Sequence, residues 1–355
     1  MFLSIITINY NNAEGLRKTL ASVASQTYPH IEHIIIDGDS TDNSVEVIRE
    51  YESSLSSRLC GVSESARGDL GCSSPLASRL KWISEKDTGI YNAMNKGLEI
   101  ALGRRVVTND HTSLSIANSQ WPIAQTDYIQ ILNSGDMLAA PDVTERMMAA
   151  LEAQQAKGER LKAKGMENSK ADTPASTPYT LHSTPTEASS PYQNLPAIFY
   201  GNMIKVNAAG EVVGKSGYTE YSLRQFYSST LNHDCAYIRK DLFEEYGLYD
   251  ENLKIVSDWK WYLQAIGLGR VKPEYVDIDV TIFDDGGISE TNLALRNKER
   301  RQVLEELLPP AVLWDYDTHA FEMEQMNRLR RWKLYPLVYF MERVCFKFEK
   351  WFCKR

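Results

Sequence analysis

The chain has few cysteines, and their spacing does not pair them. Five occur among 355 residues, and no two form a CxxC pair. An odd number without such spacing predicts neither a disulfide framework nor a zinc site. Unpaired cysteines are usual in a reducing cytosol, so we expect the protein to be cytoplasmic.

Long apolar runs are missing as well. No segment holds about 18 uninterrupted apolar residues, the length that would predict a membrane-spanning helix. The apolar residues 1–8 lack the basic lead and the cleavage site of a signal peptide, so we interpret them as a strand. Positive charge is also in deficit, and the net charge of -8 argues against nucleic acid as a partner.

A glycine-rich turn is absent after the first strand. An oxidoreductase that uses a nicotinamide cofactor needs the pattern GxGxxG at this place. Residues 9–12 of this chain are Asn-Tyr-Asn-Asn instead. The sequence therefore argues against that class of enzyme.

What the chain does contain is an alternation of apolar strands and amphipathic helices. Residues 3–9 and 31–36 are almost wholly apolar, as in strands that are buried on both faces of a parallel sheet. Helical periodicity follows each of them, over residues 13–26 and again through Val45, Val47 and Ile48, where Ser40 or Thr41 could cap the helix. This order predicts an α/β fold with a doubly wound sheet, in which ligands bind at the carboxyl ends of the strands.

Three segments interrupt this pattern. Residues 53–79 and 104–126 are interpreted as insertions, because they lack clear periodicity. Residues 152–196 turn rich in Lys and Ala and then in Ser, Thr and Pro, a composition that predicts a disordered loop. We expect one large domain over residues 1–290 and a helical extension over residues 291–355.

Two carboxylates follow predicted strands directly. Asp37 ends the strand at 31–36, where it could accept a hydrogen bond from a base or a ribose, and the alternative is an ordinary turn or capping residue. Asp136 ends the segment at 128–136, behind Gly135, which would let the backbone approach phosphates closely. A single Asp suffices for a magnesium ion that also binds phosphate oxygens.

Asp258 starts an apolar helix. A carboxylate there is either a helix cap, which the helix dipole favours, or a general base that projects into a cleft. Asp277 and Asp279 also spell a DxD triplet. They alternate with apolar residues as on the solvated face of a strand, so we reject them as the metal site.

Four segments in a fixed order resemble glycosyltransferase family 2, in the branch of bacterial exopolysaccharide and colanic-acid-type transferases. They are residues 4–11, 35–42, 84–97 and 132–136, which read SIITINYN, IIDGDSTD, SEKDTGIYNAMNKG and LNSGD. The resemblance continues through His233 and Asp258 to about residue 290. It implies a GT-A fold, a nucleoside-diphosphate sugar donor, a divalent cation (Mg²⁺ or Mn²⁺) and inversion at the anomeric carbon.

The resemblance also implies roles for particular residues. Asp136 matches the metal-binding aspartate of the family's DxD-type motif, and Asp258 matches the catalytic base. Many relatives carry Asp where this chain has Asn133 and Gly135, so the metal would depend more on the donor's phosphates. Donor-binding residues are implied at Asn9, Asp37, Lys86, Asp87 and Asn133.

Two classes of function agree with these motifs. The first is a metal-dependent transferase that moves a sugar to a hydroxyl of a glycan or lipid-linked glycan in surface polysaccharide synthesis. The second is a non-catalytic scaffold that binds nucleotide sugars. Retention of both Asp136 and Asp258 favours the enzyme, because a binder has no need of a base. Lys86 and His233 are candidate phosphate or acceptor contacts, or residues that support the site.

The C-terminal segment from residue 328 is basic and aromatic. Apolar residues fall on one helical face, and basic residues fall largely on the other; they are Leu337, Val338, Met341, Val344, Cys345, Phe348, Trp351 and Phe352, against Arg343, Lys347, Lys350 and Lys354. This pattern predicts peripheral contact with the inner face of the cell membrane. A homodimer seam and packing on the catalytic domain are the alternatives.

Overall fold

We describe the fold from a computed structural model of the chain. It describes residues 1–57, 76, 79–108, 111–115, 126–168, 195–207, 209–223, 225–284, 292–333 and 335–352. Most of the two expected insertions and of the Ser/Thr/Pro-rich loop lies outside these residues.

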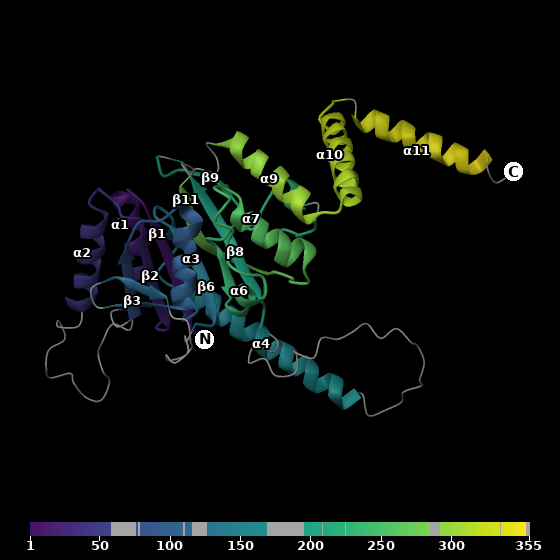
Figure 1. The fold of residues 1–355 in the computed structure, drawn as a ribbon. Coiled ribbons are helices and arrows are strands. Elements are labelled where there is room, and N and C mark those ends of the chain that lie inside the picture. Colours follow the sequence, from purple (N-terminus) through teal and green to yellow (C-terminus); the bar gives the residue numbers. More distant parts are fainter. Residues whose placement is uncertain are drawn as a thin grey trace. The chain divides into compact units, whose positions relative to one another are not determined.

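A central sheet of nine strands dominates the fold (Figure 1). Its main path runs β3-β2-β1-β6-β10-β8-β11-β7, and β9 pairs with β8. β1, β2, β3, β6, β8 and β11 run in one direction, and β10, β7 and β9 run against them. The predicted doubly wound, mostly parallel sheet is therefore confirmed. The strands are β1 (Leu3–Asn9), β2 (Ile31–Asp37), β3 (Leu80–Ser84), β6 (Tyr128–Asn133), β7 (Met137–Leu138), β8 (Ile198–Val206), β9 (Val212–Lys215), β10 (Ala236–Arg239) and β11 (Glu274–Asp284).

Helices cover both faces of the sheet because the central strands are apolar on both faces. One face packs against α1 (Ala13–Ala24), α2 (Ser44–Ser57) and α4 (Val143–Asn168). α3 (Ile90–Ala101) lies on the opposite face, against β1 and β2. A Cβ atom at Gly97 would overlap the Ile6 side chain, so glycine lets α3 approach the sheet closely.

Shorter elements complete this unit. They are a separate two-stranded sheet of β4 (Arg105–Val107) and β5 (Ser113–Ser115), with α5 (Gln225–Ser228), α6 (Asp241–Glu245) and α7 (Ser257–Tyr262). α7 continues as a π-helical turn over Leu263–Leu268.

Two segments differ from the sequence-based expectation. The start of the expected disordered loop, residues 152–168, continues α4 as a helix. The segment is rich in Ala, Lys and Glu, which favour helix, so its composition alone did not separate a helix from a loop. The start of the first expected insertion belongs to α2, which ends at Ser57.

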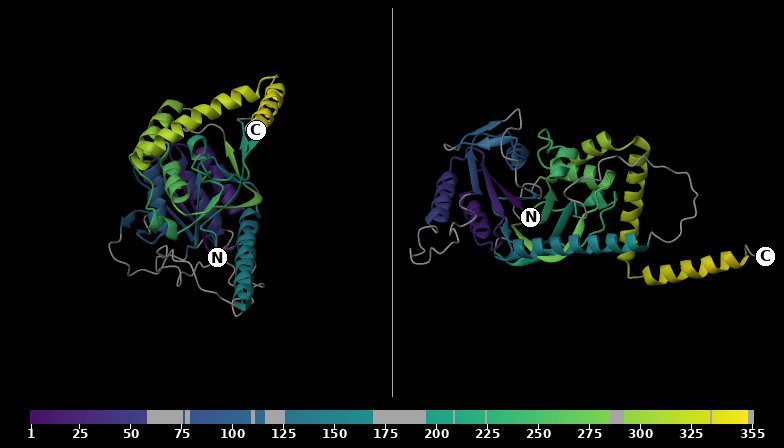
Figure 2. Two further views of the ribbon diagram at one scale, coloured as in Figure 1. Left: turned by 90° about the vertical axis from the view of Figure 1, so that its right-hand side faces the viewer. Right: turned by 90° about the horizontal axis from the view of Figure 1, so that it is seen from below.

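Residues 1–296 form one compact unit, and residues 297–355 form a second. The second unit holds most of α9 (Leu293–Leu307), with α10 (Pro310–Arg330) and α11 (Tyr335–Phe352). Figure 2 shows α10 and α11 as two separate helical rods. Of the helices described, none is both long enough and apolar enough to cross a membrane.

Candidate active site

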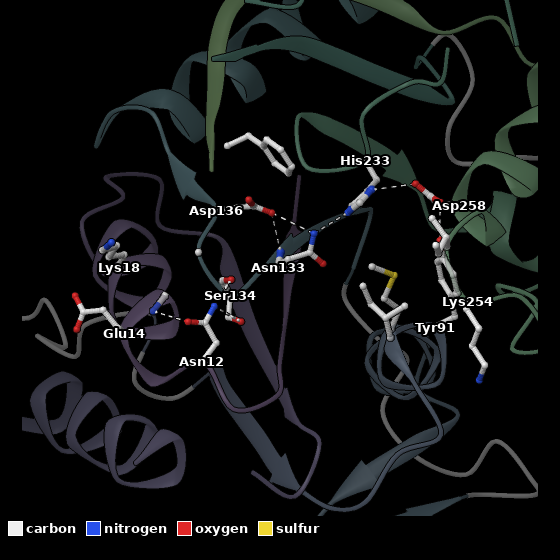
Figure 3. A pocket seen from close by; sticks show the side chains of 16 residues that line it. Asn12, Glu14, Lys18, Tyr91, Asn133, Ser134, Asp136, His233, Lys254 and Asp258 are labelled. Carbon is white, nitrogen blue, oxygen red and sulfur yellow. Dashed lines mark hydrogen bonds and ion pairs between the residues drawn. The ribbon is translucent and has the colours of Figure 1, made fainter. Parts of the chain in front are cut away.

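A cavity of about 460 Å³ opens at the carboxyl ends of β1 and β6. Its walls come from α1, the turn after β6, α3, the segment before β10, the loop into α7, and β11. Figure 3 shows Asp136 on one side of this cavity and Asp258 on the other, with His233 between them. The structure thus brings the two predicted functional carboxylates into one cavity, although they lie far apart in the sequence.

The turn that carries Asp136 is fixed by α1. The Thr19 hydroxyl donates to the Asp136 carbonyl at 2.7 Å and accepts from the Gly135 N–H at 2.9 Å. Gly135 has φ of +116°, a backbone region that favours glycine. Glycine is thus required by the conformation of the turn itself, which places the Asp136 carboxylate in the cavity.

Asp258 is positioned by the aromatic residues that follow it. The indole N–H of Trp259 donates to the Phe226 carbonyl at 2.7 Å, and that of Trp261 donates to the Gly247 carbonyl at 2.8 Å. Both rings are buried. These contacts anchor the short helix α7, so Asp258 in its first turn is held at the cavity wall.

The two carboxylate oxygens of Asp258 have separate partners. The Tyr91 hydroxyl donates to Oδ1 at 2.8 Å, and His233 Nδ1 lies 3.3 Å from Oδ2. Burial alone would raise the pKa of Asp258, but the hydrogen bond and charge of His233, with the bond from Tyr91, outweigh it and lower the pKa. Asp258 is therefore an anion at neutral pH.

His233 lies among three carboxylates. Burial alone would lower the pKa of His233, but the hydrogen bond and charge of Asp258, with the charges of Asp234 and Asp136, raise it to about 9. Burial and the charge of Asp234 raise the pKa of Asp136 to about 7. His233 is therefore protonated at neutral pH, and its positive charge lies beside the Asp258 anion.

The residues of this site fit a divalent cation. Mg²⁺ and Mn²⁺ prefer oxygen ligands, and Mg²⁺ needs only one or two carboxylates when phosphates supply the rest. Asp136 presents a buried carboxylate, and the Oδ1 atom of its neighbour Asn133 is buried and accepts no hydrogen bond among the described residues. No group of three or more His, Cys, Asp or Glu residues that could hold a metal occurs in the described part of the chain. A cation here would depend on ligands from outside the protein.

Asp37 does not line the cavity. It is completely buried, and its Oδ1 accepts hydrogen bonds from Asn9 Nδ2 at 2.8 Å and from Ser40 Oγ at 2.6 Å. Its Oδ2 accepts from Ser84 Oγ at 2.7 Å and from the Ser40 N–H at 3.0 Å. Asp37 and Asn9 together hold the ends of β1, β2 and β3, which favours the turn role that the sequence left open. A direct contact with base or ribose stays a prediction.

Asp87 lies next to this network. Its Oδ1 accepts from the Gly89 N–H at 2.9 Å, at the start of α3. A Cβ atom at Gly38 would overlap its Oδ2. Asp87 is therefore held across the ends of β2 and β3. Lys86 is exposed, and its carbonyl accepts from Lys96 Nζ at 2.8 Å. Neither residue lines the cavity, whereas Asn133 does.

Sequence reasoning missed several residues of the site. Tyr91 lies inside the motif at residues 84–97, which predicted no separate role for it. Its place in the first turn of α3 is the signal that could have indicated a side chain near the strand ends. Asp234 is buried beside His233 and accepts from the Thr281 hydroxyl at 2.7 Å. Lys18 and Lys254, which line the cavity, gave no signal because exposed lysines are common.

Comparison with known proteins finds similarity to one family. The model of glycosyl transferase family 2 matches residues 4–73. An uncharacterised glycosyltransferase of Mycobacterium tuberculosis is 31% identical over 150 residues, which cover 42% of this chain and 39% of that protein. The putative teichuronic acid biosynthesis glycosyltransferase TuaG of Bacillus subtilis is 32% identical over 108 residues, 30% of this chain and 34% of TuaG.

Over residues 4–73 the chain is thus similar to glycosyltransferase family 2. Its matches span less than half the length of the two relatives. The crystal structure of TarS from S. aureus aligns with 88% of this chain and 41% of TarS, with a TM-score of 0.50 and 13% identity, a similarity of fold. The expected GT-A fold is thereby confirmed. The family match includes Asn9 and Asp37 but ends before Asp136 and Asp258, whose roles stay predictions.

We expect His233 to remain an imidazolium at pH 7.5. Its raised pKa means that the contribution of its proton to stability is fully present below about 6.5, the unfolded value, and is lost as pH rises through about 9. Replacing Asp258 with Asn removes the negative charge at Nδ1 and moves the His233 pKa down. Titration of the imidazole by NMR measures this pKa.

The matched control is Asp250→Asn. Asp250 lies in the loop that leads to α7, and its carboxylate pairs with Lys260. The control should leave the His233 pKa unchanged. A His233 that titrates near 6.5 in the wild-type protein would contradict the ion pair.

Proposed function

We propose that this protein is an inverting glycosyltransferase, which moves a sugar from a nucleoside diphosphate to a hydroxyl of a glycan acceptor. One observation carries the proposal: Asp136 and Asp258 open on the same cavity, each held by a separate set of anchors. The match of residues 4–73 to family 2 supports it, because family 2 is a family of glycosyl transferases. The cavity also has the size range of small-molecule sites.

The donor nucleotide is assigned to the carboxyl ends of β1, β2 and β3. Open α/β sheets bind ligands at this edge. Asn9, Asp37 and Asp87 give the edge a fixed shape through their hydrogen bonds. The diphosphate would then lie toward Asp136, where Lys18 and Lys254 line the same cavity and supply positive charge.

A divalent cation completes this arrangement. Asp136 and the Asn133 side-chain oxygen would hold it, in agreement with the buried carboxylate and the unpartnered oxygen found there. When bound, such a cation neutralises charge on the departing diphosphate. Only Asp136 in this turn carries charge, so the cation would need the donor's phosphates as further ligands.

Asp258 acts as the general base in this proposal. Its lowered pKa keeps it ionised, and Tyr91 and His233 hold the carboxylate in one orientation. An acceptor hydroxyl would lose its proton to Asp258 as its oxygen forms the new bond to the anomeric carbon. The bond from that carbon to the diphosphate breaks at the same time, on the opposite face of the sugar. The configuration at the anomeric carbon is therefore inverted.

His233 supports this step without touching the sugar. As an imidazolium it stabilises the Asp258 anion. His233 lies between the base and the cation-binding turn (Figure 3). A scaffold that only binds nucleotide sugars would have no use for an oriented anion at Asp258, which favours the enzyme.

The acceptor is proposed to be a surface polysaccharide or a lipid-linked precursor of one. TuaG, one of the similar proteins, is named for teichuronic acid biosynthesis. A lipid-linked acceptor would lie at the inner face of the cell membrane, and α11 would bind the protein to that surface. Residues 337–341 on this helix are exposed, and the C-terminal segment is basic. Exposed apolar side chains with flanking basic residues favour an anionic lipid surface.

Cation and donor should bind together more tightly than either alone. The physical reason is that Asp136 supplies one charged ligand and the donor's phosphates supply the others. Calorimetric titration of UDP-, GDP- and dTDP-sugars, with and without Mn²⁺ or Mg²⁺, measures this coupling. Asp136→Asn should abolish the effect of the cation, and the control Asp142→Asn, an exposed aspartate at the start of α4, should not. Equal donor affinity with and without both cations would contradict the proposed metal site.

Asp258→Asn should keep donor binding and lose transfer by about 10²- to 10⁴-fold, the usual contribution of a general base. Tyr91→Phe removes only one hydrogen bond to that base, so its loss should be smaller. Transfer is measured as release of nucleoside diphosphate in the presence of acceptor. Near-full transfer by Asp258→Asn would remove Asp258 as the base.

Removal of the C-terminal segment should weaken membrane binding. A variant that ends at residue 327 should sediment less with vesicles of anionic lipid than the full chain does. Vesicles of zwitterionic lipid should bind the full chain weakly, because the basic residues gain nothing there. Equal binding of both proteins to anionic vesicles would exclude the membrane role of the segment.

A further inference from the structure

A group of aromatic rings lies outside the cavity, on β8, β11 and the segment after β9. Tyr200 forms its base, with ring centroids 5.4 Å from Tyr275 and 5.6 Å from Tyr221. Tyr218 extends the group outward, 5.8 Å from Tyr275. Tyr200 is 2% exposed and Tyr218 is 70% exposed, so the group runs from the interior to the surface.

The segment that carries Tyr218 is attached to the sheet. The Thr219 N–H donates to the Tyr200 hydroxyl at 3.3 Å, and that hydroxyl donates to the Thr219 carbonyl at 3.2 Å. The Ser216 N–H also donates to the Met203 carbonyl at 2.9 Å. Hydrogen bonds on both sides of Tyr218 therefore hold an exposed aromatic ring in place.

Two carboxylates lie beside these rings. Asn202 is completely buried, and its Nδ2 donates to Asp277 Oδ1 at 2.8 Å and to Asp279 Oδ1 at 2.9 Å. The Tyr275 hydroxyl lies 2.8 Å from Asn202 Oδ1 and 3.1 Å from Asp277 Oδ1. Bonds from Asn202 and Tyr275 lower the pKa of Asp277, which stays ionised. We name Tyr218, Tyr221, Tyr275, Asn202, Asp277 and Asp279 the aromatic–carboxylate patch.

The polar atoms of the patch indicate which ligand it suits. Lys215 pairs with Asp279 at 2.6 Å, so Asp277 holds the remaining negative charge of the patch. Among the described residues, the hydrogen bonds from Asn202 and Tyr275 to Asp277, an exposed residue, both reach its Oδ1, which leaves Oδ2 as an acceptor. An open ring face beside an acceptor oxygen suits a ligand with both apolar and hydroxyl surfaces.

We propose that the aromatic–carboxylate patch binds an uncharged sugar residue of the acceptor glycan. The C–H face of the sugar ring packs on Tyr218, and a sugar hydroxyl donates to Asp277 Oδ2. Uronic acids and phosphorylated sugars are disfavoured, because Asp277 and Asp279 repel their charges. This proposal rests on the proposed glycosyl transfer, since it names a subsite for the acceptor of that reaction.

β11 connects the patch to the cavity. Asp277 and Asp279 lie on it, and Thr281, two residues beyond Asp279, donates to Asp234 next to His233. Two strand residues span about 7 Å. Phe283, further along the same strand, lines the cavity. The patch and the cavity thus lie at two points along one strand.

The test is glycan binding by the full chain without any donor. Saturation-transfer NMR and calorimetry are run with neutral hexasaccharides of glucose, mannose and N-acetylglucosamine, and with an oligogalacturonate of equal length. At least one neutral oligosaccharide should bind, and the oligogalacturonate should bind more weakly. Tyr218→Ala and Asp277→Asn should each weaken the neutral ligand by about tenfold, the upper range for a contact of this kind. The controls Tyr339→Ala and Asp142→Asn should not.

Several outcomes would overturn the patch: no binding of any neutral oligosaccharide, stronger binding of the acidic one, or equal affinity in the two patch variants and the controls. Donor titrations of the same variants separate this inference from the proposed function. Both patch variants should bind the donor with Mn²⁺ as the wild-type protein does. If donor binding is absent in every protein while glycan binding depends on Tyr218, the transferase proposal fails and the glycan site remains.

Discussion

The parallel register of four neighbouring strands determines where this site can form. In β3, β2, β1 and β6, the paired positions at the carboxyl ends are Ser84 with Asp37, Asp37 with Asn9, and Ile8 with Asn133. A shift of one residue in any pair would turn these polar side chains to the other face of the sheet. The apolar strands, buried on both faces, keep that register, so the stability of the core and the geometry of the polar edge have the same origin.

Charge balance is the second constraint on the site. Asp136, Asp234 and Asp258 are carboxylates within the influence of a single imidazolium, His233. Such a group is costly to bury unless further positive charge is present. The protein meets part of this need by partial protonation of Asp136, whose pKa is raised to about 7, and the proposed cation would meet the rest. Buried negative charge thus favours the ligands that the reaction requires.

Elements with strong periodicity, and residues inside ordered motifs, could be predicted from the sequence. The strands through Asn9 and Asp37 and the positions of Asp136 and Asp258 were predictable for that reason. The helical extension of α4 to Asn168 was not, since residues 152–168 have no regular apolar pattern in the sequence. Contacts such as Tyr91 with Asp258, or Asn202 with Asp277, join segments remote in sequence, and a single sequence contains no record of such pairs.

One helix connects the two halves of the cavity. Lys96 of α3 binds the Lys86 carbonyl in the loop before it, while Asn95 binds the backbone of Tyr249 and the carboxylate of Glu251. The loop before α3 and the segment that leads to Asp258 are therefore held by two adjacent residues of one helix. The position of this helix fixes where both segments lie at the cavity. Insertions elsewhere in the chain can change in length or sequence, and so alter what the protein recognises, without disturbing the distance over which the chemistry operates.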